Sequence, residues 1–263
     1  MLKKDKLKLP LLWMEKWKHL DPFEHVFQIE GEIFREQPGR QTLRFSENKE
    51  TYFLKRHSGI GLGEIFKNLF QLRLPILGAK NELEAISALE KFGFVPEITG
   101  YGFHQSRSFI ITRELTYTIS LEDFCRDFLI KPPSLKLKRA LIQKVAGISK
   151  IIHDSGVNHR DFYLCHFLLD ITGGGREFLD PDNLNLTVID WHRAHARKKV
   201  PLRWRIKDIA GLYFSAMEIG LTKRDCQRFM KVYHYHDKTF WQQVEKRATA
   251  LYRKIKEKSH VGE

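Results

Sequence analysis

The sequence predicts an α+β fold of two lobes, a small β-rich lobe over about 21–115 and a larger helical lobe over about 116–263. Short segments of β-forming residues alternate with tight turns in the first part, whereas segments with helically spaced apolar residues dominate the second. The change falls near residues 112–119, where we expect a hinge. Strands followed by helices are typical of α+β proteins. Residues 1–20 are expected to form a basic extension before the first lobe.

In the first lobe, a turn is expected at Asp21-Pro22, ahead of three short antiparallel strands. The expected strands of this meander are residues 32–36, 41–46 and 51–56. Turns between them are predicted at 37–40 and 47–50 because Pro, Gly, Asn and charged residues gather there. Two further strand signals fall within residues 101–114.

A helix is expected over residues 80–92, and Gly93 ends it. Its apolar stripe consists of Leu83, Ile86 and Leu89. In the second lobe, Ser120 and Asp123 predict a helix that opens with a capping box. A long helix follows over residues 134–153, and the chain from about residue 203 is mostly helical.

The chain has 263 residues, and its 45 Lys and Arg residues exceed its 32 Asp and Glu residues to give a net charge of +13. This surplus favours an anionic partner, such as nucleic acid, anionic lipid or glycolipid, a phosphorylated ligand or an acidic protein. A solvated basic surface without a specific partner is the alternative interpretation. The charge alone does not choose between them.

The length of the apolar stretches and the number and spacing of the cysteines indicate the cellular location. No apolar stretch approaches the roughly 18–20 residues that span a membrane, and the basic N-terminus is not followed by the apolar segment of a signal peptide. The three cysteines are widely spaced and odd in number, which fits a reducing compartment. We therefore expect a cytosolic protein.

The most specific motif is the run NHRDFYLCHFLL at residues 158–169. A His-Arg-Asp tripeptide between an amphipathic helix and an apolar strand is the pattern of a kinase catalytic loop. Phosphoryl transfer needs a carboxylate that orients the attacking hydroxyl and accepts its proton, and Asp161 is placed for this role. Five residues later that pattern expects a metal-binding Asn, but this chain has His166. A helix-end turn with an Arg–Asp ion pair is the alternative interpretation.

A second apolar strand ends in Asp190, where a kinase has the Asp of its D-F-G motif, although Trp and His follow here instead of Phe and Gly. If residues 166–170 and 186–190 pair as an antiparallel hairpin, His166 and Asp190 meet near Asp161. The topology therefore predicts a metal site formed by these two side chains. A conceivable zinc cluster, whose spacing matches no common zinc finger, comprises His153, His159, Cys165 and His166.

Lys55 lies on the third expected strand, where a kinase keeps the lysine that reaches the nucleotide phosphates. Its carboxylate partner should come from the next helix. Glu82 shares the inward face of that helix with Ile86 and Leu89, whereas Glu84 lies off the stripe. Glu82 is therefore the expected partner, and Glu84 is the fallback.

Two further residues are assigned to nucleotide binding. Arg40 belongs to the Pro-Gly-Arg turn that would meet the phosphates, although this turn lacks repeated glycines. Glu114 lies at the expected hinge. For Lys55 and Glu82, a surface lysine and an ordinary helix carboxylate are the alternative interpretations.

The chain resembles the lipopolysaccharide core heptose(I) kinases, a family of protein-kinase-like sugar kinases. The similar runs are PILGAKNELEAI, NHRDFYLCHFLL, VIDWHRA, RWRIKDIAGLYFSA and IGLTKRD. The resemblance extends from about Asp21 to Tyr233. It implies a protein-kinase-like fold, use of ATP and Mg²⁺, and transfer of the γ-phosphate to the first heptose of the lipopolysaccharide inner core. It also implies a location at the cytoplasmic face of the inner membrane of a Gram-negative bacterium.

The resemblance also implies roles for single residues. Asp161 would be the base, Lys55 the phosphate-binding lysine and Glu82 its partner. Asp190 with His166 would form the metal side. Asp208, at the start of an apolar helix, would support the catalytic loop through its backbone rather than take part in the chemistry.

The segment after Asp190 indicates an acceptor that is not a peptide. It is too short for a peptide-binding platform and carries seven Lys and Arg residues before its first acid, Asp208. Such a patch suits the carboxylates and phosphates of inner-core sugars and lipid A. The cations assigned to the acceptor are Arg197, Lys198, Lys199 and Arg203. A solvated face is the alternative.

Two other functions stay open at this point. The chain could be a kinase for another sugar, such as Kdo or an aminoglycoside, or a catalytically weak kinase-like binding protein. The expected partners are the glycolipid acceptor and the membrane surface, with an acidic protein such as acyl carrier protein as a further candidate and no nucleic acid. Residues 57–79, which are Gly-rich, basic and apolar, are candidates for membrane contact.

Overall fold

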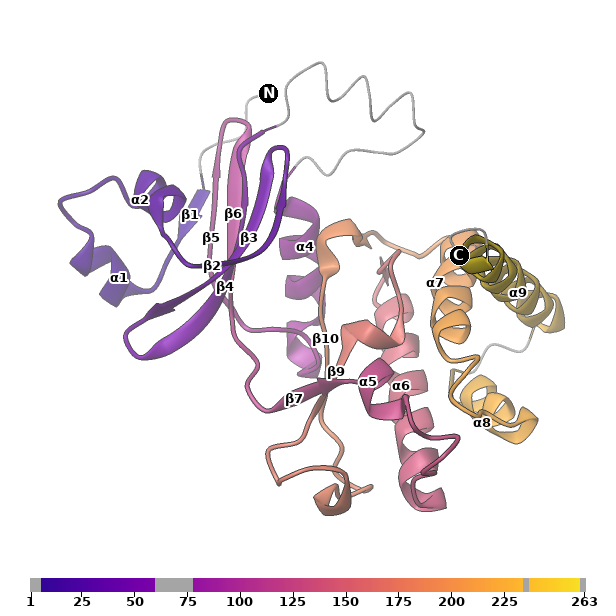
Figure 1. The fold of residues 1–263 in the computed structure, drawn as a ribbon. Coiled ribbons are helices and arrows are strands. Elements are labelled where there is room, and N and C mark those ends of the chain that lie inside the picture. The colour runs from indigo at the N-terminus through magenta and orange to yellow at the C-terminus, as the bar shows by residue number, and fades with distance from the viewer. Residues whose placement is uncertain (1–5, 60–77, 234–236, 261–263) are drawn as a thin grey trace. The chain divides into compact units, whose positions relative to one another are not determined.

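The computed structural model describes residues 6–59, 78–233 and 237–260, and Figure 1 shows their fold. The chain divides into two compact units. The first comprises residues 1–87 and 96–115, and the second comprises residues 88–95 and 116–263. Strands dominate the described part of the first unit and helices that of the second, which confirms the predicted α+β fold. None of the described helices is long and apolar enough to cross a membrane.

The first unit is built on one antiparallel sheet with the strand order β1-β5-β6-β4-β3-β2. Its strands are β1 (Lys6–Lys8), β2 (Glu32–Gln37), β3 (Arg40–Glu47), β4 (Glu50–His57), β5 (Ile98–His104) and β6 (Arg107–Arg113). Its helices are α1 (Leu11–Lys16), α2 (Pro22–Gln28) and most of α4 (Lys80–Leu89). The predicted meander is present as β2, β3 and β4.

The N-terminal residues belong to this unit rather than standing apart from it. β1 pairs with β5, and Trp13 and Trp17 are buried in a cluster that includes Phe45 and Tyr52. The turn expected at Asp21-Pro22 is wrong, because a helix begins there. Asp21 Oδ1 accepts hydrogen bonds from the amides of the first turn of α2, and Pro22 takes the first helical position, where no amide hydrogen is needed.

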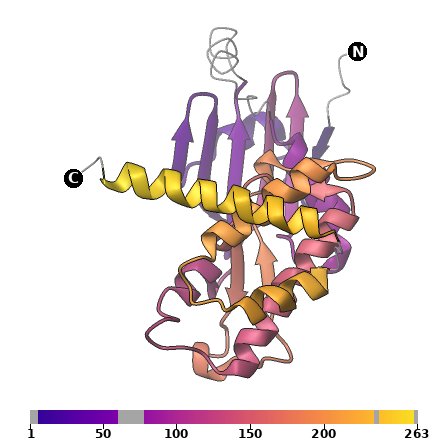
Figure 2. The same cartoon turned by 90° about the vertical axis from the view of Figure 1, so that its right-hand side faces the viewer.

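The second unit is mainly helical, with three small antiparallel pairings of strands. Its helices are α5 (Leu121–Cys125), α6 (Leu135–Asp154), α7 (Leu202–Ser215), α8 (Lys223–Tyr233) and α9 (Lys238–His260). Its strands are β7 (Thr118–Ser120), β8 (Val157–Asn158), β9 (Phe167–Asp170), β10 (Leu186–Val188) and β11 (His195–Ala196). Single 3₁₀ turns are η1 (Glu90–Phe92), η2 (Leu164–His166), η3 (Arg176–Phe178) and η4 (Trp191–Arg193). α6 packs against α8 and α7 against α9 (Figure 2).

The helix ends follow from local chemistry that the sequence displays. Ser120 Oγ accepts a hydrogen bond from the Asp123 amide at 3.0 Å, which confirms the expected cap of α5. Ser134 caps α6 in the same way. The helix expected over 80–92 is present as α4 and η1, and Gly93 ends it with φ 73°, a left-handed conformation that glycine adopts without strain.

A buried carboxylate ties α8 to α6. Asp225 Oδ2 accepts from the Thr222 amide at 3.0 Å, and Thr222 Oγ1 accepts from the Asp225 amide, so the two residues form a capping box. The same carboxylate contacts Lys138 Nζ of α6 at 2.9 Å and Arg228 Nη1 at 2.8 Å. Burial alone would raise the pKa of Asp225, but the Thr222 amide and the Lys138 ammonium lower it to about 2.

This clamp predicts a pH-dependent contribution to stability. The folded-state pKa lies below the ordinary value, so the stabilisation is present above about pH 4 and is lost as the pH falls toward 2. Asp225→Asn should lower the free energy of unfolding at pH 7 by about 2 kcal/mol, as measured by urea titration. Asp182→Asn, which breaks the exposed pair with Lys136, should leave that free energy nearly unchanged. Equal losses in the two variants would contradict the assignment.

Candidate active site

The catalytic-loop motif is held by its backbone. β8 leads directly into His159, and the buried carboxylate of Asp208 on α7 accepts hydrogen bonds from the amides of His159 at 2.7 Å and Arg160 at 2.9 Å. Arg160 has φ 77°, a left-handed conformation that is strained for a residue with a side chain. The expected contact between Asp208 and the loop is therefore present, and it fixes the backbone on which Asp161 stands.

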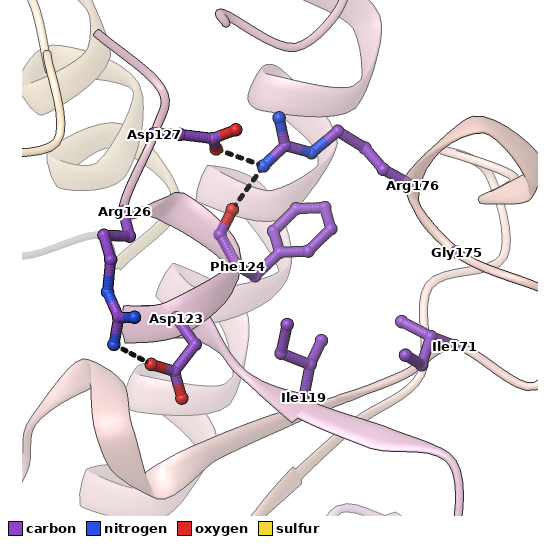
Figure 3. A pocket seen from close by; sticks show the side chains of 8 residues that line it. All are labelled: Ile119, Asp123, Phe124, Arg126, Asp127, Ile171, Gly175 and Arg176. Atoms are coloured by element: carbon purple, nitrogen blue, oxygen red, sulfur yellow. Dashed lines mark hydrogen bonds and ion pairs between the residues drawn. The ribbon is translucent and has the colours of Figure 1, made fainter. Parts of the chain in front are cut away.

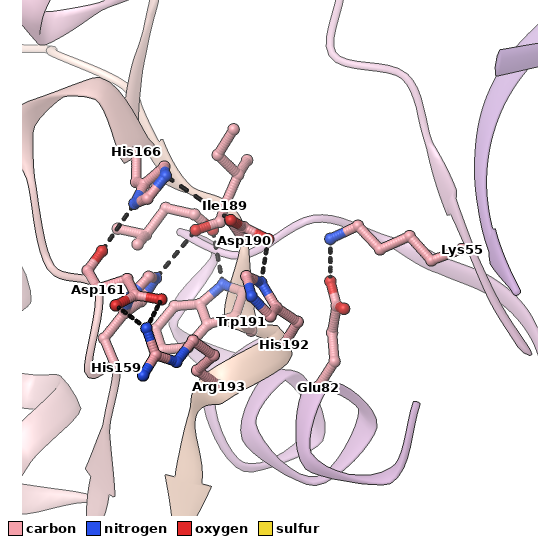
Figure 4. A network of polar contacts seen from close by, with 11 residues as sticks. Lys55, Glu82, His159, Asp161, His166, Ile189, Asp190, Trp191, His192 and Arg193 are labelled. Atoms are coloured by element: carbon pink, nitrogen blue, oxygen red, sulfur yellow. Dashed lines mark hydrogen bonds and ion pairs between the residues drawn. The ribbon is translucent and has the colours of Figure 1, made fainter. Parts of the chain in front are cut away.

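The carboxylate of Asp161 is paired with a cation that the sequence pattern does not indicate. Arg193 Nη1, in the 3₁₀ turn after Asp190, lies 2.9 Å and 3.1 Å from the two Asp161 oxygens (Figure 4). The Arg193 side chain is 44% exposed and that of Asp161 18% exposed. The contact joins residues 32 positions apart, so the sequence offered only the general basicity of this segment as a signal.

The structure brings His166 and Asp190 together. β9 and β10 pair as the predicted antiparallel hairpin, with Phe167 opposite Val188, and His166 Nε2 lies 3.7 Å from Asp190 Oδ2. His166 Nδ1 contacts the carbonyl oxygen of Asp161 at 2.7 Å. Because a carbonyl only accepts, Nδ1 must carry the proton, and in the neutral ring the lone pair of Nε2 is then directed away from this bond.

This pair fits one side of a divalent-metal site. Among the described residues, no group of three or more His, Cys, Asp or Glu side chains could hold a metal ion. Asp190 and His166 would therefore supply only part of the metal's ligands, and the other ligands would be oxygen atoms from elsewhere. Mg²⁺ in nucleotide sites takes phosphate and water oxygens together with one or two carboxylates, which suits such an incomplete set. The imidazole is the unusual ligand, since nitrogen is a softer donor than oxygen.

The conceivable zinc cluster is not assembled. His153 lies between Tyr233 Oη at 2.7 Å and Asp208 Oδ2 at 3.3 Å, and His159 Nε2 contacts the Ile189 carbonyl at 2.9 Å. Burial lowers the pKa of His159, which favours the neutral ring. These histidines support the loop and the hairpin from inside the unit.

The residues that replace Phe and Gly after Asp190 have structural roles. Trp191 is fully buried, and its indole nitrogen donates to the Val188 carbonyl at 2.7 Å. His192 Nδ1 lies 2.5 Å from Asp190 Oδ1 and orients that carboxylate. Asp190 itself has φ 64°, a second strained backbone position in the motif. The sequence pattern did not indicate a role for His192.

In the first unit, Lys55 and Glu82 form the expected ion pair. Lys55 Nζ on β4 lies 2.6 Å from Glu82 Oε1 on α4, and the Glu82 side chain is 3% exposed (Figure 4). Glu84, the fallback, is 47% exposed and pairs with Lys80 at 3.2 Å. The apolar stripe thus identified the inward carboxylate correctly. The role of this pair in nucleotide binding stays a prediction.

The other two nucleotide-binding candidates have different surroundings. Glu114 is held by Arg44, whose Nε and Nη2 lie 2.8 Å and 2.9 Å from its two oxygens. Both Glu114 oxygens are therefore engaged within the first unit. Arg40 begins β3 directly after the turn that contains Gly39, and its backbone lies opposite His57 of β4.

Of the predicted acceptor residues, Arg197, Lys198 and Lys199 follow β11, and Arg203 lies in the first turn of α7. β11 pairs with β8, so His195 lies opposite Asn158, and the Arg197 amide donates to the Gly156 carbonyl at 3.0 Å. Because the pair is antiparallel, Lys198 and Lys199 follow at the end of β8 remote from Asp161. Both of these lysines are exposed. Gly156 has φ 80°, and a Cβ there would lie 1.9 Å from the Arg197 carbonyl oxygen, so this pairing requires glycine.

A separate hollow of about 320 Å³ lies beside α5 in the second unit (Figure 3). Arg176 enters it, contacts Asp127 at 2.5 Å and donates to the Phe124 carbonyl at 2.7 Å, with its guanidinium packed on Phe124 and Phe128. None of the predicted site residues lines this hollow. Its arginines are already paired with acids, so it has no assigned part in the chemistry.

Comparisons with known proteins identify the family. The model of the lipopolysaccharide kinase (Kdo/WaaP) family matches residues 24–233. A lipopolysaccharide core heptose(I) kinase WaaP from Escherichia coli strain K12 is 50% identical over 234 residues, covering 86% of each chain. The same enzyme from Pseudomonas aeruginosa is 46% identical over 223 residues, covering 82% of each. A solved structure of WaaP in complex with acyl carrier protein has a TM-score of 0.80 and 38% identity, covering 94% of this chain and 99% of that one.

These matches confirm the resemblance, the fold class and the type of enzyme that the sequence predicts. A kinase family also implies the use of ATP. The family model ends at residue 233, and it begins near the predicted limit of the resemblance. The chain belongs to the lipopolysaccharide kinase (Kdo/WaaP) family.

Proposed function

We propose that this chain transfers the γ-phosphate of ATP to a hydroxyl of the first heptose in the lipopolysaccharide inner core. The observation that carries the proposal is the His-Arg-Asp loop fixed by Asp208, in a chain about half identical to heptose(I) kinases. Transfer of radiolabelled phosphate from ATP to heptose-containing lipopolysaccharide from a kinase-deficient strain tests it directly. The geometry of the loop supports phosphoryl transfer, and the activity of the relatives indicates that heptose is the acceptor.

In this mechanism Asp161 orients the attacking heptose hydroxyl and accepts its proton. Asp208 and the Arg160 backbone keep the carboxylate in place without touching the acceptor. Arg193 compensates the charge of Asp161 while leaving the carboxylate at the loop surface. Positioning supplies much of the rate enhancement in phosphoryl transfer, so a rigid loop serves this reaction.

Asp190 and His166 would hold Mg²⁺, which neutralises charge on the nucleotide phosphates when bound. The 3.7 Å separation of His166 Nε2 and Asp190 Oδ2 supports this assignment, as does the bond that leaves Nε2 without a proton. Lys55, held by Glu82, would bind the phosphates from the first unit. Arg40 and Glu114 are proposed to assist, although Glu114 would act through Arg44.

The acceptor is lipid-anchored, so we propose that the protein acts at the cytoplasmic face of the inner membrane. The net charge of +13 supports attraction to an anionic bilayer. Cations that follow Asp190 would meet the acceptor, namely the half-buried Arg197 and the exposed Lys198, Lys199 and Arg203. The candidate membrane segment 57–79 lies mostly outside the described residues, since residues 60–77 are not described.

We also propose an acidic protein partner, acyl carrier protein, because the similar WaaP structure is a complex with that protein. The basic surface of the chain supports electrostatic attraction to such a partner. The second unit also contains a cavity of about 480 Å³ among α5, α6, α7, α8 and α9, with mainly apolar walls. A cavity of this kind suits an apolar group such as an acyl chain.

Replacement of the base should abolish transfer. Asp161→Asn keeps the side-chain volume but removes the proton acceptor, so kcat should fall by roughly 10²–10⁴-fold. ATP affinity and the melting temperature should change little, because Asp208 holds the loop. Transfer kinetics, ATP titration and thermal melting measure these quantities. A variant that keeps more than a few per cent of the wild-type kcat would exclude Asp161 as the base.

The phosphate clamp should behave as one unit. Lys55→Ala and Glu82→Ala should each raise the KM for ATP, and the double variant should be little worse than either single one, because each residue acts through the other. Glu84→Ala is the matched control on the same helix and should leave KM unchanged. Additive losses in the double variant would show that Glu82 is not the functional partner.

Acyl carrier protein should bind more tightly when it carries an acyl chain than when it carries only its prosthetic group. The cavity would bury the chain, and the charge attraction would be common to both forms. Calorimetry at low and high salt measures this difference. Affinity of the unacylated form should fall steeply with salt, whereas the advantage of the acylated form should persist. Equal affinity of the two forms would exclude the cavity as the acyl site.

A further inference from the structure

The side chain of Trp204, near the start of α7, is surrounded by positive charge. The guanidinium carbon of Arg160 lies 4.5 Å from the centre of a Trp204 ring. The guanidinium carbon of Arg203 and the ammonium of Lys207 each lie 5.4 Å from it. Arg160 directly precedes Asp161, so this cluster adjoins the proposed base.

Lys207 is half-buried without an acid partner. Within the described part of the chain, no carboxylate lies within ion-pair distance of its ammonium. Burial is the largest cause that lowers its pKa, and the charges of Arg193 and Arg160 act in the same direction, against the opposing charges of Asp161 and Asp208. The Lys207 ammonium is thus held where burial disfavours the charged form and no carboxylate of the described residues forms an ion pair with it.

Arg160 is in a similar position. Burial and then the Arg193 charge lower its pKa. Its Nε is buried and lacks a hydrogen-bond partner among the described residues. The acids of this region are already engaged, because Asp161 contacts Arg193 and Asp208 binds the loop amides. Asp161 and Asp208 therefore offset the charges of Arg160 and Lys207 only from a distance, without an ion pair to either. Like charges gathered in this way destabilise a fold, and they occur mainly at functional sites.

The position of the cluster relates it to the acceptor. Asp161 must meet the hydroxyl that is phosphorylated, so groups flanking Asp161 meet the sugars next to that hydroxyl. The chain between Arg193 and α7 leads away from the loop along β11 and returns at Trp204. Lys207 is therefore nearer to the reacting hydroxyl than the Lys198-Lys199 pair, which follows at the remote end of β8.

We propose that Lys207 and Arg160, arranged on Trp204, form a binding site for an anionic group of the acceptor, a carboxylate or phosphate close to the phosphorylated sugar. This inference rests on the proposed function, since it takes the glycolipid as the acceptor. An ammonium and a guanidinium fork recognise such anions by charge-assisted hydrogen bonds. The indole ring keeps the cations in place through contacts that do not neutralise them.

Steady-state transfer to native heptose-containing lipopolysaccharide tests the site in wild type, Lys207→Gln and Lys207→Arg. Lys207→Gln should raise the acceptor KM by about tenfold, the scale for losing one charged contact, with kcat and the KM for ATP changed by less than about twofold. Lys207→Arg should restore most of the acceptor affinity. Lys144→Gln removes an exposed charge on α6 and should change neither KM, which controls for net charge.

Two modified acceptors identify the anion. If the group is a sugar carboxylate, reduction of the acceptor carboxylates to alcohols should remove the difference between wild type and Lys207→Gln, whereas dephosphorylation should not. The opposite pattern identifies a phosphate. A tenfold difference that persists on both modified acceptors, or no difference on the native acceptor, overturns the proposal.

Inorganic sulfate provides a test that does not need transfer. Sulfate should perturb the tryptophan fluorescence of wild type, and the fitted Kd should rise about tenfold in Lys207→Gln but not in Lys144→Gln. Equal sulfate affinity in all three proteins overturns the anion site. A wild-type protein that binds sulfate in this manner but transfers no phosphate to heptose would contradict the proposed function while supporting the site.

Discussion

The catalytic loop depends on one buried carboxylate, that of Asp208. Two backbone amides in succession donate to it, and a buried imidazole, His153, lies 3.3 Å away. The loop needs this support because Arg160 adopts a left-handed backbone, which disfavours it by about 1–2 kcal/mol. Each hydrogen bond to a charged group contributes about 1.5–3 kcal/mol, so the pair outweighs the strain. The two hydrogen bonds thereby fix the backbone that directly precedes Asp161.

Several cations of the second unit lie close to the catalytic loop. Arg193 faces Asp161, whereas Arg160 and Lys207 lie over the Trp204 ring. The segment between Asp190 and Asp208, which carries Arg193 and Lys207, contains no acid. One imidazole connects the two proposed functional carboxylates, since His166 contacts the backbone of Asp161 with one nitrogen and faces Asp190 with the other. The proposed base and the proposed metal residues are therefore parts of one polar network rather than separate sites.

The sequence predicts the structure well where local patterns determine it. The helical stripe of α4 selected Glu82 over Glu84, and the alternation of strands and turns indicated the hairpin that joins His166 to Asp190. Local patterns were less informative where packing between distant segments decides. Trp13 and Trp17 are buried by strands that lie far along the chain, and Arg193 meets Asp161 across 32 positions of sequence. The residues next to each of these positions in the sequence do not identify the partner that it contacts.

Several contacts hold the segment between Asp190 and α7. They include the ion pair of Arg193 with Asp161, the pairing of β11 with β8, and the hydrogen bond from the Arg197 amide to the Gly156 carbonyl. Gly156 has no side chain that would separate its backbone from that of Arg197. In many kinases the equivalent stretch is long enough to change position and so to switch activity on and off. In this chain, the contacts of the segment with Asp161, β8 and Gly156 would each have to break before it could change position in that way.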